Sequence, residues 1–272
     1  MNTAAPLTDV VALARNRARA STDMLYLHRN AAEDVQDRLA MVNRRFTAPA
    51  IVTPFPQIWT DVAPNAKIVG EAETLALDER AHDLVIHGLC LHWSNDPVGQ
   101  LIQCRRALKP DGLMIAILLG GQTLNELRTC LAEAEIALKG GLSPRIAPMG
   151  EVRDLGALLQ RAGFALPVAD STLIKAVFGS ARQLMQELRG MGEGNALTGR
   201  LRAPTSPALF DLTENFYAAH YADHQGRIPA TFELIGLTGW APDASQQQPL
   251  RPGSAKQRLA DALSVTENRL PD

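Results

Sequence analysis

The clearest pattern in the chain is an alternation of short apolar runs with amphipathic stretches, and it begins at residue 83. Residues 83–87 and 113–119 are apolar runs with the length of a strand that is covered on both faces. Between them, residues 97–108 place apolar side chains at helical spacing behind a proline in the first turn. A second helical pattern follows the second run. This order predicts an α/β fold with a mainly parallel sheet and helices on both faces.

The rest of the chain carries shorter or less regular patterns. Residues 23–45 repeat apolar positions at spacings of four and three, which predicts a helix, and the prolines among residues 47–56 end it. Residues 50–53 and 67–69 are candidates for short strands. Later patterns predict helices at residues 151–162, 181–189 and 206–221 and strands at residues 165–177 and 228–240, the last as an antiparallel C-terminal edge strand.

These patterns divide the 272 residues into three parts. Residues 1–46 form an N-terminal helical extension, residues 47–240 the α/β domain, and residues 241–272 a loop-rich C-terminal tail. We see no internal repeat, so one sheet is expected to organise the core.

Composition narrows the function classes. The 27 basic and 29 acidic side chains give a net charge of -2, so the charge does not predict binding to nucleic acid. Cys90, Cys104 and Cys130 are an odd number without close spacing, which argues against a disulfide framework or a cysteine-rich zinc site. No apolar run approaches the roughly 20 residues of a membrane span, and no secretory signal is visible. We therefore expect a cytoplasmic protein without a membrane span.

Two local patterns make further predictions. Thr123 and Glu126 have the spacing of a capping box at the start of a helix. Arg15, Arg17 and Arg19 lie in a stretch that is poor in acidic residues and faintly resembles a transit peptide. Charge patterning favours the simpler interpretation, in which these arginines form a helix face exposed to solvent.

Two histidines are candidates for acid–base chemistry. His87 ends the run at 83–87, and His92 follows in the next loop, at the edge where open α/β sheets bind ligands. Either is a candidate general base near neutral pH, although a hydrogen-bonded structural histidine is the more common case. His82 stands five residues before His87, and such steps place the three histidines on different faces and elements. We therefore expect no metal site.

Several segments together resemble a known family. Residues 83–93 and 108–112, with the apolar strand that follows, resemble strands four and five of class I S-adenosylmethionine-dependent methyltransferases, which have a Rossmann-like fold. Four further segments point to one group within this family: residues 91–97, 120–128, 140–146 and 191–195. These segments are similar to the methyltransferase-like assembly factors of respiratory complex I, a family associated with arginine hydroxylation that has alphaproteobacterial relatives. A more distant resemblance is to the malonyl-carrier-protein methyltransferase of biotin synthesis.

The resemblance implies the positions of a cofactor and an acceptor. S-adenosylmethionine would contact the residues that follow the first strands of the domain: Glu71, Glu73, His87, Gly88 and Leu89. The acceptor would lie beside Trp93, Gln122, Thr123 and Arg128. His92 or His87 would serve as an optional catalytic base.

Each of these roles has a structural alternative. Glu71 and Glu73 are equally interpretable as surface carboxylates. Trp93 would then cap the core rather than cover a pocket, and Arg128 would pair with an acid such as Glu133 on its own helix.

One segment departs from the family's pattern. Class I methyltransferases follow their first strand with a Gly-rich turn, because a Cβ there would block close approach to the cofactor. Residues 51–59 hold no glycine, and Pro54 and Pro56 remove two backbone donors. We therefore interpret this segment as a buried extended segment.

The length of the N-terminal half gives an independent test. Asp83 follows Ala50 by only 33 positions, whereas a crossover unit takes roughly 30 residues or more and the family has two of them before this point. We predict that one strand-helix unit is missing and that Phe55, Ile58 or Trp59 fills the resulting gap.

Two classes of function are compatible with these observations. One is an S-adenosylmethionine-dependent methyltransferase with an unknown acceptor and a degraded cofactor loop. The other is a non-catalytic or hydroxylase-type assembly factor for respiratory complex I that binds a protein substrate or a subunit of that complex.

Overall fold

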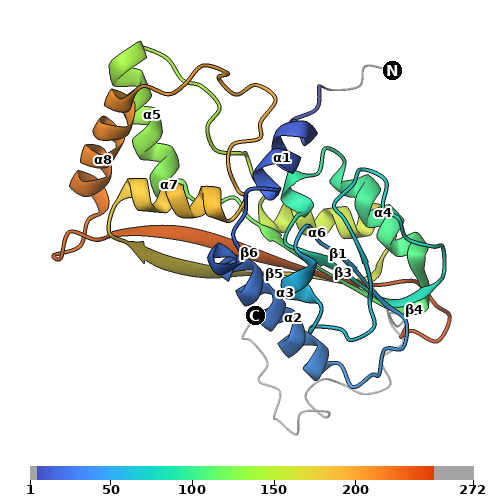
Figure 1. The fold of residues 1–272 in the computed structure, drawn as a ribbon. Coiled ribbons are helices and arrows are strands. Elements are labelled where there is room, and N and C mark those ends of the chain that lie inside the picture. Colours follow the sequence, from blue (N-terminus) through green and yellow to red (C-terminus); the bar gives the residue numbers. More distant parts are fainter. Residues whose placement is uncertain (1–4, 248–272) are drawn as a thin grey trace, which may run out of the picture. The chain divides into compact units, whose positions relative to one another are not determined.

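A computed structural model describes residues 5–247, and its core is a six-stranded sheet in the order β2-β1-β3-β4-β6-β5 (Figure 1). The first four strands in this order pair in parallel, and β6 pairs antiparallel with both of its neighbours. Within the described residues, those from 5 to 242 belong to one compact unit. The strands are β1 (Pro49–Val52), β2 (Lys67–Val69), β3 (His82–Gly88), β4 (Leu108–Leu119), β5 (Ala165–Phe178) and β6 (Ile228–Trp240).

Helices cover both faces of the sheet, as the alternating pattern predicts. Apolar side chains of α2, α5, α7 and α8 join the core on one face, and those of α4 and α6 join the core on the other. The helices are α1 (Val10–Arg17), α2 (Tyr26–Met41), α3 (Pro56–Trp59), α4 (Pro97–Ala107), α5 (Asn125–Lys139), α6 (Val152–Arg161), α7 (Ala181–Gly190) and α8 (Pro207–Tyr221), with short 3₁₀ turns η1 (Thr22–Met24) and η2 (Leu91–Trp93).

The position of β4 in the sheet explains why its residues 113–119 are all apolar. Side chains alternate along a strand, so Leu113, Ile115 and Ile117 enter one core while Met114 and Ala116 enter the other. A strand buried on both faces has no solvent side, and the prediction of a covered parallel strand is confirmed.

The C-terminal strand is antiparallel, as predicted, but it does not lie at the edge. Strand β6 lies between β4 and β5, and β5 forms the edge. Most of β6 is buried, whereas most of β5 is exposed or half-buried. Glu233 makes β6 look less buried in the sequence than it is, because a charged residue usually indicates an exposed position. In the structure its carboxylate is buried and accepts the backbone N–H of Gln122 at 2.9 Å.

The N-terminal half is truncated, as its length predicts. Between β1 and β3 the chain forms the four-residue helix α3 and the three-residue strand β2, so the two parallel connections, β1 to β2 and β2 to β3, contain one short helix between them. Trp59 of α3 is fully buried, and an ideal Cβ built on Gly88 would lie 2.7 Å from its ring. Its indole N–H donates to His28 Nδ1 at 3.2 Å. Trp59 thus fills space beside the end of β3, and Phe55 is buried as well.

The predicted capping box at the start of α5 is wrong. Helix α5 begins after Leu124, which has a positive φ of 57° and no side-chain cap. Thr123 Oγ1 instead accepts the backbone N–H of Glu233, and Glu126 accepts the hydroxyl and backbone N–H of Thr231. Both side chains contact β6, so a tertiary contact has replaced the local one.

Two expectations concern what the fold lacks. No helix within residues 5–247 is both long and apolar enough to cross a bilayer. Over the same residues, no group of three or more His, Cys, Asp and Glu side chains has an arrangement suited to a metal ion. Residues 1–4 and 248–272, the ends of the predicted extension and tail, lie outside the described residues.

Filling of the truncated half by Trp59 makes a prediction about stability. We expect Gly88→Ala to lower the free energy of unfolding by about 1–3 kcal/mol, because the added methyl group would press on a buried ring. Gly70→Ala is the matched control, since nothing lies within 4 Å of its ideal Cβ. Urea denaturation of both variants checks this, and equal midpoints would contradict the close packing of Trp59 on β3.

Candidate functional site

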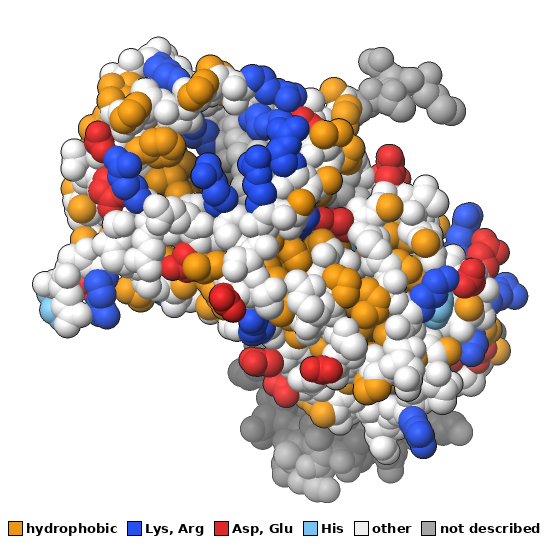
Figure 2. All heavy atoms as spheres, in the orientation of Figure 1, with side chains coloured by type: hydrophobic (Ala, Val, Ile, Leu, Met, Phe, Trp, Pro, Cys, Tyr) orange, Lys and Arg blue, Asp and Glu red, His pale blue; other side chains and the backbone are white. Residues whose placement is uncertain are grey.

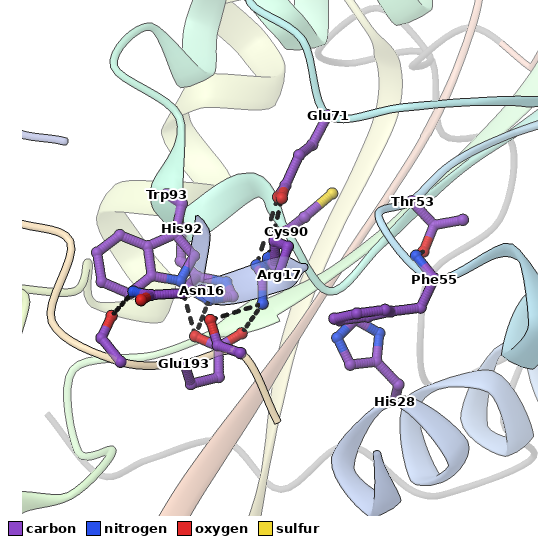
Figure 3. Close-up of polar contacts among 12 residues, drawn as sticks. Asn16, Arg17, His28, Thr53, Phe55, Glu71, Cys90, His92, Trp93 and Glu193 are labelled. Carbon is purple, nitrogen blue, oxygen red and sulfur yellow. Dashed lines mark hydrogen bonds and ion pairs between the residues drawn. The ribbon is translucent and has the colours of Figure 1, made fainter. Parts of the chain in front are cut away.

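The candidate site lies at the carboxyl ends of β1 and β3, where the sequence places its ligand-binding loops. Figure 3 shows a buried group of charged side chains there, contributed by three distant segments. Arg17 comes from the end of α1, Glu71 follows β2, and Glu193 follows α7. We call these three residues the Arg17 cluster.

Arg17 is the centre of this cluster. Its Nε lies 2.9 Å from Glu71 Oε1, and one terminal nitrogen lies 2.6 Å from Glu193 Oε1. The guanidinium carbon also lies 5.4 Å from the centre of the Phe55 ring. The Arg17 side chain is only 7% exposed. The prediction that this arginine belongs to a solvent-exposed face is therefore wrong, because tertiary partners absent from its own stretch neutralise it.

Backbone pairing holds Arg17 in this position. The N–H of Asp9 donates to Ala196 O at 2.8 Å, and the N–H of Ser21 donates to Gly190 O at 2.8 Å. Gly192 has a positive φ of 77°, and its ideal Cβ would lie 3.3 Å from the Cα of Arg17. Segment 7–21 and segment 190–200 therefore approach closely, and glycine at 192 suits both the conformation and the contact.

Glu193 is the most fully bonded acid of the site. Its second oxygen accepts the indole N–H of Trp93 at 2.7 Å and lies 3.3 Å from His92 Nε2. Burial by itself would raise the pKa of Glu193, but the charges of Arg17 and His92 outweigh this effect and hold the pKa well below its usual range. Burial would likewise lower the pKa of Arg17, and Glu193 and Glu71 instead raise it. The pair is therefore charged at neutral pH.

The two candidate bases are both enclosed. His87 is fully buried, with Nε2 2.7 Å from Gln100 Oε1 and Nδ1 3.5 Å from Cys90 Sγ. Burial lowers the pKa of His87 to about 4, so the ring is neutral at physiological pH. The His92 side chain is 1% exposed, and its Nδ1 has no hydrogen-bond partner among the described residues. Neither ring lines the cavities of about 40 Å³ and 240 Å³ that lie at this end of the sheet.

The other residues that the resemblance assigns to cofactor contact are either buried or line only a small cavity. Gly88 is in contact with Trp59, and Leu89 is buried with a positive φ of 52°. Glu71 and the exposed Glu73 line a cavity of only about 40 Å³, together with Cys90 and neighbours of Trp93.

This volume tests whether S-adenosylmethionine fits. Ligand pockets usually enclose about 300–1,000 Å³, so a space of about 40 Å³ holds water but not a nucleoside. Arg17 and Phe55 fill the region beside Glu71, which a cofactor would otherwise occupy. The arrangement therefore does not accommodate the cofactor, and no chemical step can be derived through it.

The residues implied for the acceptor are only partly brought together. Trp93 borders both the small cavity and a larger apolar cavity of about 240 Å³, which Glu193 also borders. Gln122 is exposed and Thr123 is bound to β6. Arg128 donates to Ala147 O at 3.3 Å.

The alternative interpretation of Arg128, as the partner of Glu133 in an ion pair, does not hold either. Glu133 lies 2.9 Å from His220 Nε2 instead of pairing with Arg128. None of Gln122, Thr123 and Arg128 lines the larger cavity, which leaves Trp93 as the acceptor-side prediction that borders it.

Sequence reasoning missed the residues that dominate the site. Glu193 lies within residues 191–195, whose resemblance to the family was recognised, and the glycines on both sides of it were the available signal. Arg17 had no such signal, because its partners are 54 and 176 residues away.

Comparisons with known proteins agree with this fold. A family model described as a methyltransferase domain matches residues 14–116. The mitochondrial arginine-hydroxylase NDUFAF5 of Danio rerio is 37% identical over 209 residues, which are 76% of this chain and 64% of that protein. The chain thus spans less than two thirds of that relative's length.

Two bacterial relatives carry methyltransferase names. The malonyl-[acyl-carrier protein] O-methyltransferase of Xylella fastidiosa is 32% identical over 179 residues, covering 66% of this chain and 58% of that protein. The "Putative methyltransferase RP459" of Rickettsia prowazekii is 34% identical over 167 residues, covering 58% of this chain and 74% of that protein. Together with the sheet order and the segments quoted above, these matches place the chain by descent as well as by architecture. The chain belongs to the methyltransferase family and is a homologue of the arginine-hydroxylase NDUFAF5 proteins.

Proposed function

We propose that the chain takes part in the assembly of respiratory complex I by binding a protein partner, with its S-adenosylmethionine position closed. The observation that carries this proposal is the Arg17 cluster, which takes up the space beside Glu71. Similarity to the NDUFAF5 proteins, which are named arginine-hydroxylases, supports a protein as the partner. A cytoplasmic location for this chain is part of the same proposal.

The absence of the Gly-rich turn supports closure independently. Thr53 Oγ1 accepts the N–H of Phe55 at 3.2 Å, so the backbone after β1 bonds locally instead of facing a ligand. Buried Phe55 and Trp59 then occupy the interior on either side of His28. Opening this space requires more than the rotation of one side chain.

A second candidate is an enzyme in which α1 moves away and exposes the cofactor position. One observation favours it, because α1 has only eight residues and the apolar side chains that it buries are those of Ala12 and Leu13. Departure of α1 would release Glu71, the acid that the family resemblance assigns to cofactor contact. Methyl transfer or hydroxylation of a protein arginine would then be the activity to seek.

Calorimetry with S-adenosylmethionine separates the two candidates. We expect no binding heat at 1 mM cofactor, which means a dissociation constant weaker than about 1 mM, or about -4.1 kcal/mol. The positive control is a malonyl-carrier-protein methyltransferase that retains the Gly-rich turn. Binding by this chain tighter than about 100 μM, roughly -5.5 kcal/mol, would reject closure and favour the enzyme.

A double variant tests whether the prolines alone close the site. We expect Pro54→Gly with Pro56→Gly to leave cofactor binding absent, because Trp59 and the missing strand-helix unit are unchanged. Calorimetry on the purified variant, with circular dichroism as the control for folding, makes the measurement. Tight cofactor binding would show that two residues caused the defect and would remove the argument from truncation.

Deletion of the gene tests the role in assembly. In the organism that encodes the chain, we expect loss of assembled complex I on native gels and recovery with the wild-type gene. Mass spectrometry of complex I subunits then asks whether an arginine has gained one oxygen atom. Normal complex I in the deletion strain would refute the proposal. Loss of assembly on deletion, in a strain whose wild-type complex I carries no added oxygen on arginine, would favour binding without catalysis, whereas an arginine oxygen that is present in the wild type and absent after deletion would favour the enzyme.

A further inference from the structure

The larger cavity adjoins the Arg17 cluster at Glu193 and lies on the face of the sheet that α5, α7 and α8 cover. It encloses about 240 Å³, and its walls are mostly apolar. Leu119 from the end of β4, Leu127 from α5 and Phe232 from β6 form part of these walls, and Trp93 borders the cavity from η2. Apolar cavities of this kind exclude water and bind apolar groups.

The acidic group at the inner end of the cavity is already hydrogen-bonded, so it does not require a polar ligand. Glu193 is the acid in its wall, and both of its oxygens are already bonded, to Arg17 on one side and to Trp93 and His92 on the other. A buried carboxylate with these partners has little need of a further donor. The part of a ligand that reaches Trp93 should therefore be hydrocarbon.

The outer part of the cavity has the opposite character. Met185, Arg189 and Phe210 belong both to its lining and to a shallower hollow of about 320 Å³ that also includes Arg182. Figure 2 shows blue side chains of Lys and Arg gathered beside orange apolar ones around a hollow of this surface. The cavity therefore communicates with a basic and partly apolar surface.

Arg189 is a basic side chain of this outer region that forms no ion pair with a described residue. It is exposed, and among the described residues no carboxylate lies within ion-pair distance of it. Arg182 is paired with Asp211, and Arg145 is paired with Glu135, so these two arginines are neutralised. Burial also leaves Nε of Arg145 without a hydrogen-bond partner. A ligand head group at this end should be an anion that accepts hydrogen bonds from Arg189.

We propose that this cavity binds an amphiphilic anion, with an unbranched hydrocarbon tail of about ten carbons directed toward Trp93 and the anionic head at Arg189. The length follows from volume, since a cavity of about 150 Å³ holds benzene with its six carbons, and the present one is about 240 Å³. The inference goes beyond the proposed role in assembly and requires no cofactor. A carboxylate and a phosphate head share the chemistry that Arg189 recognises.

Calorimetric titration with decanoate and with decyl phosphate tests the proposal and distinguishes the two head groups. We expect at least one of them to bind, and decanol, butyrate and decyltrimethylammonium to bind at least tenfold more weakly. Arg189→Gln should weaken binding of the anion about threefold to tenfold and leave decanol unchanged. No binding of either anion, or equal binding of decanol, would overturn the proposal.

A second pair of variants tests the location. Met185 is half-buried on α7 and belongs to both hollows, so Met185→Trp should block the passage and weaken anion binding at least tenfold. Met185→Leu is the matched control, because it conserves volume and should bind as the wild type does. Unchanged binding by a folded Met185→Trp variant would place the ligand elsewhere and reject this site.

Discussion

The buried charge of Arg17 is the constraint around which the rest of the candidate site is arranged. A guanidinium that is 7% exposed requires carboxylates, and Glu71 and Glu193 supply them from opposite parts of the chain. Such a pair adds little net stability, because removing both partners from water costs nearly as much as their attraction returns. Its effect is specificity: loss of one partner leaves an unpaired buried charge, which typically costs about 3–5 kcal/mol. The cluster therefore determines where α1 sits and how Trp93 and His92 are oriented.

Much of the fold could be predicted because burial on both faces leaves a direct trace in the sequence. The run at 113–119 is apolar at every position, and each side chain enters one of two cores. Chain length also carried information, since the short interval before β3 left room for two very compressed parallel connections with one short helix between them.

Elements whose polar residues make tertiary contacts were harder to predict. Glu233 sits in the buried strand β6, where its carboxylate binds the backbone of residue 122, so the strand looked like an edge. Thr123 and Glu126 have the spacing of a cap, yet both bond to β6. Local rules describe what a segment prefers in isolation, and here long-range hydrogen bonds satisfied the same groups.

The sequence predicted where the candidate site lies, but it did not predict which residues form it. His87, His92 and Trp93 lie at the expected end of β3, and two of them border or bond to the Arg17 cluster. What the sequence could not indicate is that a cation from an N-terminal helix would occupy the position expected for a cofactor. Arg17 and Glu193 are 176 residues apart, and nothing in either local stretch points to the other.

That separation has a consequence for the order of events during synthesis. At about 5–20 residues per second, a ribosome needs on the order of 10–35 s to advance from the codon of Arg17 to that of Gly192. Throughout this interval the charged end of α1 has no Glu193 to pair with, and β6, which separates β4 from the edge, has not been made. The nascent chain therefore passes through a stage in which the central strands exist but their terminal partners do not. Pairing of Arg17 with Glu193 therefore cannot occur until the strands β1 to β5 have been made, and it becomes possible before β6 has been synthesised.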